Sequence, residues 1–115
     1  GRILNVSSIW SIVSKEKRSI YSASKSGLDG LTRSLSLDFA PFNILVNSVA
    51  PGYVDTKMIK VYNSEKELEK IKKIIPLGRF AKPTEIGDLV KFLCSEKNSY
   101  ITGQVIPIDG GYLTR

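Results

Sequence analysis

Histidine is absent from the 115 residues, and cysteine occurs only once, as Cys94. A single cysteine excludes an internal disulfide and a cysteine-cluster zinc site. Without histidine there is no imidazole-based catalytic triad and the commonest metal ligand is missing. We therefore expect no metal site, and any acid-base chemistry has to use Tyr, Lys, Asp or Glu.

Long apolar runs are also missing. No segment approaches the roughly 20 apolar residues that cross a bilayer, and no charged-then-apolar leader opens the chain. We expect no membrane partner and a cytoplasmic location. The length, with 42% hydrophobic and 24% charged residues, is typical of one globular domain spanning residues 1–115.

Positive charge exceeds negative charge, with 17 Lys and Arg against 11 Asp and Glu, a net of +6. Most of the excess lies between Lys57 and Lys82. The run Glu65–Lys73 (EKELEKIKK) mixes both signs, which favours a solvated helix face over a nucleic-acid stripe. Attraction of an acidic substrate is the alternative, and we expect no nucleic-acid partner.

Hydrophobic periodicity predicts alternating strands and helices. The expected strands are 2–6, 44–49 and 105–108, and the expected helices are 20–40, 64–73 and 85–95. Residues 7–19 and the segment after Ala50-Pro51-Gly52 should be loops. Such alternation indicates an α/β fold with right-handed crossovers and a parallel sheet between helices. The first helix should bury an apolar stripe of Ile20, Ala23, Leu28, Leu31, Leu35 and Phe39.

Tyr21 and Lys25 are four residues apart at the start of the first long helix, so their side chains should share one face. Two other Tyr-Lys pairs have the same spacing, at 53 and 57 and at 62 and 66, but neither lies in an expected helix. A phenol ordinarily has a pKa near 10, and a nearby ammonium group stabilises the phenolate. The alternative is that Lys25 joins Asp29 and Arg33 in a surface ion-pair column.

The first strand delivers Ser7 and Ser8 at its carboxyl end, where parallel α/β sheets place their chemistry. Together with four further motifs, this segment resembles the carboxyl-terminal half of the short-chain dehydrogenase/reductases, and the 3-oxoacyl-(acyl-carrier-protein) reductase branch in particular. The motifs are Asn5–Ser8 (NVSS), Tyr21–Lys25 (YSASK), Val46–Thr56 (VNSVAPGYVDT), Ile101–Gln104 (ITGQ) and Asp109–Gly111 (DGG).

The resemblance implies a Rossmann-like three-layer fold and an oxidoreductase that uses NAD or NADP to interconvert a carbonyl and a secondary alcohol. It implies that Ser8, Tyr21 and Lys25 are catalytic and that Tyr21 and Lys25 also contact the cofactor. The substrate would be a small carbonyl or alcohol compound, which in this branch is linked to a carrier protein. The segment matched to the nicotinamide end contributes Pro51, Gly52, Val54 and Thr56.

The glycine-rich phosphate-binding motif of that family does not occur in this sequence, because the nine glycines are scattered. We therefore expect a partial Rossmann-like domain, the catalytic and substrate half of a protein about twice this length. Such a chain should be inactive alone, with an exposed strand edge. The alternative is a non-catalytic assembly module that retains the fold and the oligomer interface.

Three remaining features carry structural expectations. Trp10 either lines a substrate pocket or covers the core. Cys94 should be a packed small hydrophobic residue. A column of small residues on the first long helix permits close helix approach, and the resemblance implies a homo-oligomer, a dimer or tetramer, built on that helix; the column consists of Ser22, Ser26, Gly30 and Ser34.

Overall fold

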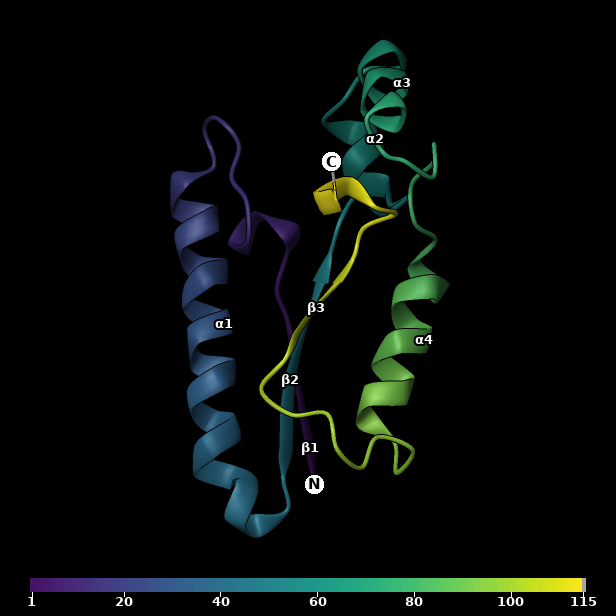
Figure 1. Cartoon of the computed structure of the whole chain (residues 1–115). Helices are drawn as coiled ribbons and strands as arrows, with labels where there is room; N and C mark the ends of the chain where they lie inside the picture. Colours follow the sequence, from purple (N-terminus) through teal and green to yellow (C-terminus); the bar gives the residue numbers. More distant parts are fainter. Residues whose placement is uncertain (115) are drawn as a thin grey trace.

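The computed structural model describes residues 1–114, which contain a three-stranded parallel sheet. The strands are β1 (Arg2–Val6), β2 (Leu45–Pro51) and β3 (Val105–Ile108), in the spatial order β1-β2-β3 (Figure 1). The central strand β2 pairs Val49 with Val6 on one side and with Ile106 on the other. Residues 45–50 are all buried, so β2 forms the centre of the core.

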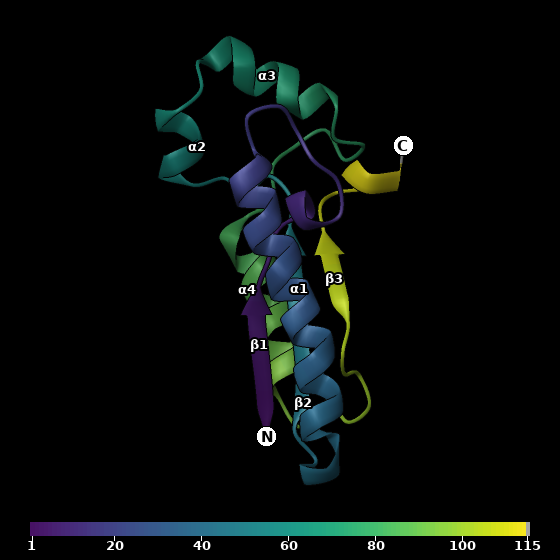
Figure 2. The same cartoon turned by 90° about the vertical axis from the view of Figure 1, so that its left-hand side faces the viewer.

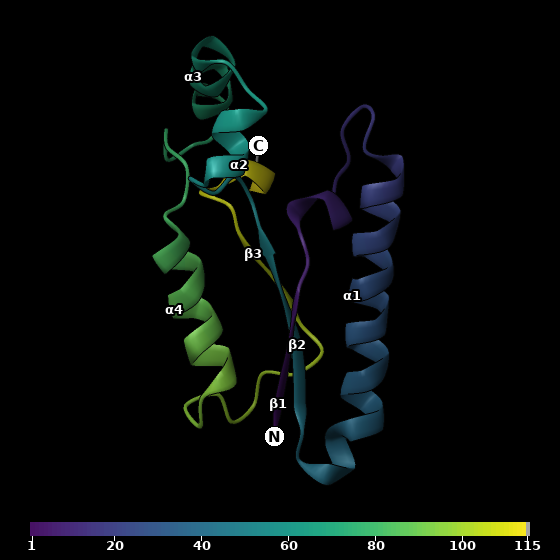
Figure 3. The same cartoon turned by 180° about the vertical axis from the view of Figure 1, so that it is seen from behind.

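Helices cover both faces of this sheet. α1 (Ser19–Phe39) lies on one face and α4 (Pro83–Cys94) on the other, as Figures 1 and 3 show. α2 (Lys57–Val61) and α3 (Glu65–Lys73) lie beyond the carboxyl ends of the strands. This arrangement confirms the predicted three-layer α/β fold. Short 3-10 turns complete it: η1 (Ile9–Ser11), η2 (Ala40–Phe42) and η3 (Tyr112–Thr114).

Local sequence signals explain where α3 and α4 begin. Ser64 caps α3 by accepting the amide hydrogen of Glu67, whose carboxylate accepts from the Ser64 amide in return. α4 opens with Pro83, whose missing N–H costs nothing at a first helical position. Both helices, and β1 and β3, match the sequence-based ranges within two residues.

Three features near the carboxyl ends of the strands differ from expectation. β2 continues to Pro51 instead of ending at Val49, because the next ladder donor is the Gly52 amide, which bonds the Ile108 carbonyl at 3.0 Å. The missing N–H of proline therefore costs no ladder bond. The expected loop 7–19 contains η1, and α2 was not anticipated, since five residues give too little periodicity to detect.

The face of α1 that packs on the sheet is small and polar, so the predicted apolar stripe is partly wrong. Ile20 is 86% exposed and Leu31 49%, whereas Asp29, Thr32 and Ser36 are buried. Short polar side chains let the helix axis approach the sheet, and each finds a hydrogen-bond partner.

The buried polar groups of α1 bond to the sheet or to their own helix. The Ser48 hydroxyl donates to the Asp29 carboxylate at 3.3 Å. The Thr32 hydroxyl accepts from the side-chain amide of Asn5 at 2.9 Å and donates to the carbonyl of Leu28. Because Asp29 is 4% exposed and faces the sheet, the surface ion-pair column of Lys25, Asp29 and Arg33 does not form.

Cys94 is exposed, which corrects the expectation that it packs as a small hydrophobic residue. Its neighbour Leu93 occupies the buried position of that turn at 2% exposure. Only one of two adjacent helical residues can face the sheet, and the larger apolar side chain does so. Among the described helices, none has the length and apolar character that a bilayer crossing requires.

The turn 101–104 leads from the loop after α4 into β3 and is hydrogen-bonded to β2. Gly103 donates its amide to the Val46 carbonyl, and the Thr102 hydroxyl accepts from the Val46 amide at 3.0 Å. Gly103 has φ +71°, and a Cβ there would lie 2.7 Å from the Ser36 hydroxyl oxygen of α1. Both the backbone conformation and the contact with α1 therefore require glycine.

We expect Gly103→Ala to destabilise the fold by about 1–3 kcal/mol, because it combines a strained backbone with a steric clash. The measurement is chemical denaturation followed by circular dichroism. Gly27→Ala is the matched control: nothing lies within 4 Å of the position that a Cβ would take there, so alanine should stabilise α1 by about 0.5–1 kcal/mol. Equal effects of the two substitutions would contradict this packing.

Candidate active site

Ser7 and Ser8 leave the carboxyl end of β1 and are both buried. The Ser7 amide extends the ladder by bonding the Val49 carbonyl at 2.8 Å. Ser8 caps η1, and its hydroxyl oxygen accepts from the Trp10 amide at 3.3 Å. A hydroxyl that accepts one main-chain hydrogen bond keeps its own proton available for another partner.

Serine hydroxyls attach η1 to the first turns of α1. Ser26 donates to the Ser11 carbonyl at 3.0 Å, and Ser14 and Ser22 join their hydroxyls at 3.0 Å. Figure 2 shows η1 beside the amino-terminal end of α1. These bonds hold the Ser8 segment against the part of α1 that carries Tyr21.

Tyr21 and Lys25 lie together on α1, as their spacing predicts. The Lys25 ammonium nitrogen is 5.7 Å from the centre of the Tyr21 ring and donates to the Val6 carbonyl at 2.8 Å. Tyr21 is 40% exposed, so its ring remains accessible. The strand end thus fixes the cation one helical turn from the phenol.

The other two Tyr-Lys pairs of equal spacing do not share a helix. Tyr53 precedes α2 in an irregular segment, while Tyr62 ends α2 and Lys66 belongs to α3. Helical context therefore separates the pair at Tyr21 from the other two, as expected from the sequence.

The segment after β2 presents the residues matched to cofactor binding. Val54 forms an isolated bridge with Ala81. Thr56 precedes α2, and its hydroxyl makes no capping bond to that helix. The Gly52 N–H is already bonded to the Ile108 carbonyl, so it is not free to donate a hydrogen bond to a ligand.

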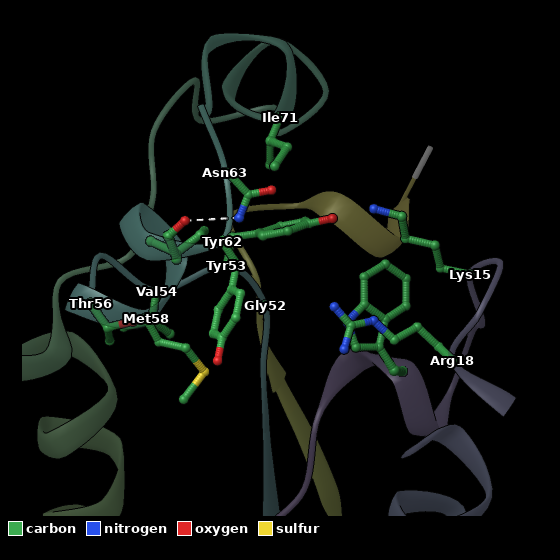
Figure 4. Close-up of a pocket in the computed structure, with 12 residues that line it drawn as sticks. Lys15, Arg18, Gly52, Tyr53, Val54, Thr56, Met58, Tyr62, Asn63 and Ile71 are labelled. Carbon is green, nitrogen blue, oxygen red and sulfur yellow. Dashed lines mark hydrogen bonds between the residues drawn. The ribbon is translucent and has the colours of Figure 1, made fainter. Parts of the chain in front are cut away.

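A cavity of about 480 Å³ opens between this segment, η1 and helices α2 and α3 (Figure 4). Gly52, Val54 and Thr56 lie along it, whereas Pro51, Ser8, Tyr21 and Lys25 are not among its lining residues. The remaining lining residues are Trp10, Lys15, Arg18, Tyr53, Met58, Ile59, Tyr62, Asn63 and Ile71.

Trp10 both lines this cavity and packs in an aromatic cluster, which answers the question left open by the sequence. Its ring meets Tyr53 and Tyr112 edge-on at centroid distances of 6.1 and 6.0 Å. Tyr53 and Tyr112 are 5.7 Å apart. The cluster joins η1, the end of β2 and η3, and so fixes the cavity wall next to Ser8.

Sequence reasoning missed the wall supplied by Met58, Ile59, Tyr62 and Ile71, and it passed over Lys15 and Arg18. The first group depends on α2 and α3 folding over the strand ends, which short-range periodicity does not reveal. The basic pair lies within the serine-rich loop, where its charge was a visible signal. Among residues 1–114, no cluster of acidic or cysteine side chains could hold a metal ion.

Arg79 and Glu85 form a bidentate ion pair where the post-β2 segment meets α4, at 2.7 and 2.8 Å. The Lys82 amide also donates to the Glu85 carboxylate. The hydrogen bond from Arg79, followed by that from Lys82, lowers the pKa of Glu85 to about 2. The pair therefore stays charged at any ordinary pH and ties the segment to the helix.

The lowered pKa of Glu85 predicts that the contact between Arg79 and Glu85 is sensitive to acid. The stability that this ion pair contributes is present above the ordinary carboxylate pKa of 4.5 and is lost as the pH falls toward about 2. Thermal unfolding at several pH values should show wild type more stable than Glu85→Gln near neutrality, with the difference shrinking through that window. A difference independent of pH would contradict a charged role for Glu85.

The family model described as enoyl-(acyl carrier protein) reductase matches residues 1–113 of the chain. This match agrees with the parallel sheet flanked by helices. The chain belongs to the short-chain dehydrogenase/reductase family and corresponds to its carboxyl-terminal portion.

Individual relatives agree with this membership. The chain is 50% identical over 111 residues to the 3-oxoacyl-(acyl-carrier-protein) reductase of Aquifex aeolicus, covering 96% of this chain and 44% of the relative. A tropinone reductase homolog of Arabidopsis thaliana is 42% identical over 112 residues, covering 96% and 35%.

Solved structures share the fold. A short chain dehydrogenase family protein from Francisella tularensis superposes with a TM-score of 0.91 at 38% identity, covering 100% of this chain and 52% of that one. Acetoin dehydrogenase from Enterobacter cloacae gives 0.86 at 40% identity, covering 99% and 44%. The chain thus spans between about a third and a half of the length of these relatives.

Proposed function

We propose that the protein containing this chain is an NAD(P)-dependent oxidoreductase that interconverts a carbonyl and a secondary alcohol. The chain itself would supply the catalytic and substrate half of the domain. The observation that carries the proposal is the Lys25 ammonium, held by the Val6 carbonyl one turn from the accessible phenol of Tyr21. Ser8, buried at the end of the adjacent strand, supplies a second hydroxyl.

The residues along the cavity fit the nicotinamide end of a dinucleotide. The Thr56 hydroxyl makes no capping bond and lines the cavity beside Gly52 and Val54. The Lys25 ammonium group uses one of its three N–H donors on Val6 and keeps two, one of which can bond a ribose hydroxyl. Its positive charge acts on Tyr21 whichever donors are used. When bound, the nicotinamide supplies or accepts the hydride.

Proton transfer is the task of the chain's own residues. In the reducing direction Tyr21 gives its phenolic proton to the carbonyl oxygen while that carbon gains the hydride, which yields a neutral secondary alcohol. The phenolate left behind is stabilised by the Lys25 ammonium. The Ser8 hydroxyl donates to the same substrate oxygen and steadies the charge that develops there. Oxidation reverses each transfer.

The substrate that best fits the relatives is a 3-oxoacyl compound, the class named for the Aquifex aeolicus protein. Because Phe42 and its neighbours after α1 are uncharged, this stretch offers no basic contact for an acidic carrier protein.

We also propose that the protein forms a homo-oligomer through the small-residue column of α1, and that it is located in the cytoplasm.

Tyr21→Phe in the protein carrying both halves should abolish carbonyl reduction, followed by the loss of NADPH or NADH absorbance, with cofactor affinity nearly unchanged. Only the proton donor is removed, and the ring that packs beside Lys25 is kept. A phenylalanine variant that retains substantial turnover would refute the proton-donor role.

Lys25→Ala serves as the companion variant. It removes both the cation beside the phenol and a donor to the ribose, so kcat should fall and the cofactor Kd should rise together. The non-catalytic assembly module would instead form a tight oligomer that never binds NADH or NADPH. Nicotinamide fluorescence titration of the purified protein decides between these two functions.

A further inference from the structure

Lys15 and Arg18 line the cavity from the loop that joins η1 to α1. Figure 4 shows both side chains on one side of the cavity, with Met58, Tyr62 and Asn63 on the other. Neither cation belongs to the motifs that carry the proposed hydride-transfer chemistry. Their presence in the wall of this cavity therefore needs a separate explanation.

The charge of these two side chains is not consumed by an acid. The ion pairs found within residues 1–114 are Lys60 with Asp55, Lys72 with Glu69, and Arg79 with Glu85. None of them includes Lys15 or Arg18.

The positive charge of Lys15 contributes to lowering the pKa of one carboxylate, that of Glu67. The pKa of Glu67 is lowered chiefly by its hydrogen bonds with the backbone and side chain of Ser64, and only weakly by Lys15. Its carboxylate oxygen already accepts both the amide and the hydroxyl of Ser64 at 2.7 Å. Glu67 is therefore engaged in the cap of α3, and Lys15 and Arg18 remain available to an anionic ligand in the cavity.

The rest of the wall makes this charge effective. Trp10, Met58, Ile59, Tyr62 and Ile71 give the cavity a largely apolar lining. An apolar wall lowers the local dielectric and strengthens the attraction between a cation and an anion that share the space. Lys15 and Arg18 are themselves exposed, so the strength of the attraction depends on how well these apolar side chains shield an anion in the cavity from water.

Arg18 lies close in the chain to Tyr21, the proposed proton donor. Arg18 immediately precedes α1 and Tyr21 follows three residues later, about 4.5 Å along the helix axis at ~1.5 Å per residue. We propose that Lys15 and Arg18 bind an anionic group, a carboxylate or a phosphate, that the substrate carries close to its reacting carbonyl. This specificity rests on the proposed function, because it assumes that the substrate occupies this cavity.

The test compares matched neutral and anionic ligands with the protein carrying both halves. Acetoacetate against ethyl acetoacetate probes a carboxylate, and dihydroxyacetone phosphate against dihydroxyacetone probes a phosphate. In at least one pair the anionic member should have a kcat/KM about tenfold higher or more. The double variant Lys15→Gln with Arg18→Gln should remove that preference while changing the neutral member less than about twofold. The pair that responds identifies the anion.

Lys17→Gln is the control variant, because Lys17 lies between the two in sequence and is exposed as they are, but does not line the cavity. It should leave the preference unchanged. Equal rates for both members of both pairs, or an equal loss in the control, would overturn the proposal.

Binding measured by isothermal titration calorimetry separates this inference from the proposed function. A protein that reduces none of these compounds yet binds an anionic member more tightly, through Lys15 and Arg18, would refute the oxidoreductase and retain the anion site. A protein that reduces the neutral members without any anionic preference would retain the oxidoreductase and refute the anion site.

Discussion

The hydrogen bond from the Lys25 ammonium to the Val6 carbonyl is the interaction on which the site depends. It joins the carboxyl end of β1 to the first turns of α1, and it fixes a positive charge one turn from Tyr21. A flexible lysine would spend much of its time in solvent. Held by a strand end, the same cation stays beside the Tyr21 ring, which is the arrangement that the proposed proton transfer uses.

The polar underside of α1 serves this geometry. Asp29 and Thr32 bond Ser48 and Asn5 of the sheet, and Gly103 leaves room for Ser36. These contacts bring α1 close to β2, and the serine bonds between η1 and α1 then hold Ser8 beside it. Buried polar networks specify one arrangement more sharply than apolar packing, because any displacement leaves a donor or acceptor without its partner. The positions of Ser8, Tyr21 and Lys25 and the packing of α1 are thus set by the same contacts.

Sequence periodicity was sufficient for the α/β architecture and for the pairing of Tyr21 with Lys25, because both follow from local spacing. It failed for the buried face of α1, where Ile20 and Leu31 point away from the sheet. Hydrophobicity is a poor guide where the close approach of a helix to a sheet demands small side chains. It failed likewise for the α2–α3 wall, whose position depends on long-range packing. The roles of Ser8, Pro51, Gly52, Val54 and Thr56 came from family resemblance. They stay predictions, as do the catalytic roles of Tyr21 and Lys25.

The most direct measurement is a crystal structure of the protein carrying both halves, bound to an oxidised nicotinamide cofactor and a secondary alcohol. The account predicts the alcohol oxygen within about 2.6–3.2 Å of both the Tyr21 and the Ser8 hydroxyl oxygens, with the Lys25 nitrogen still on the Val6 carbonyl. An alcohol oxygen bonded to other groups, with Tyr21 turned away from the nicotinamide, would contradict it.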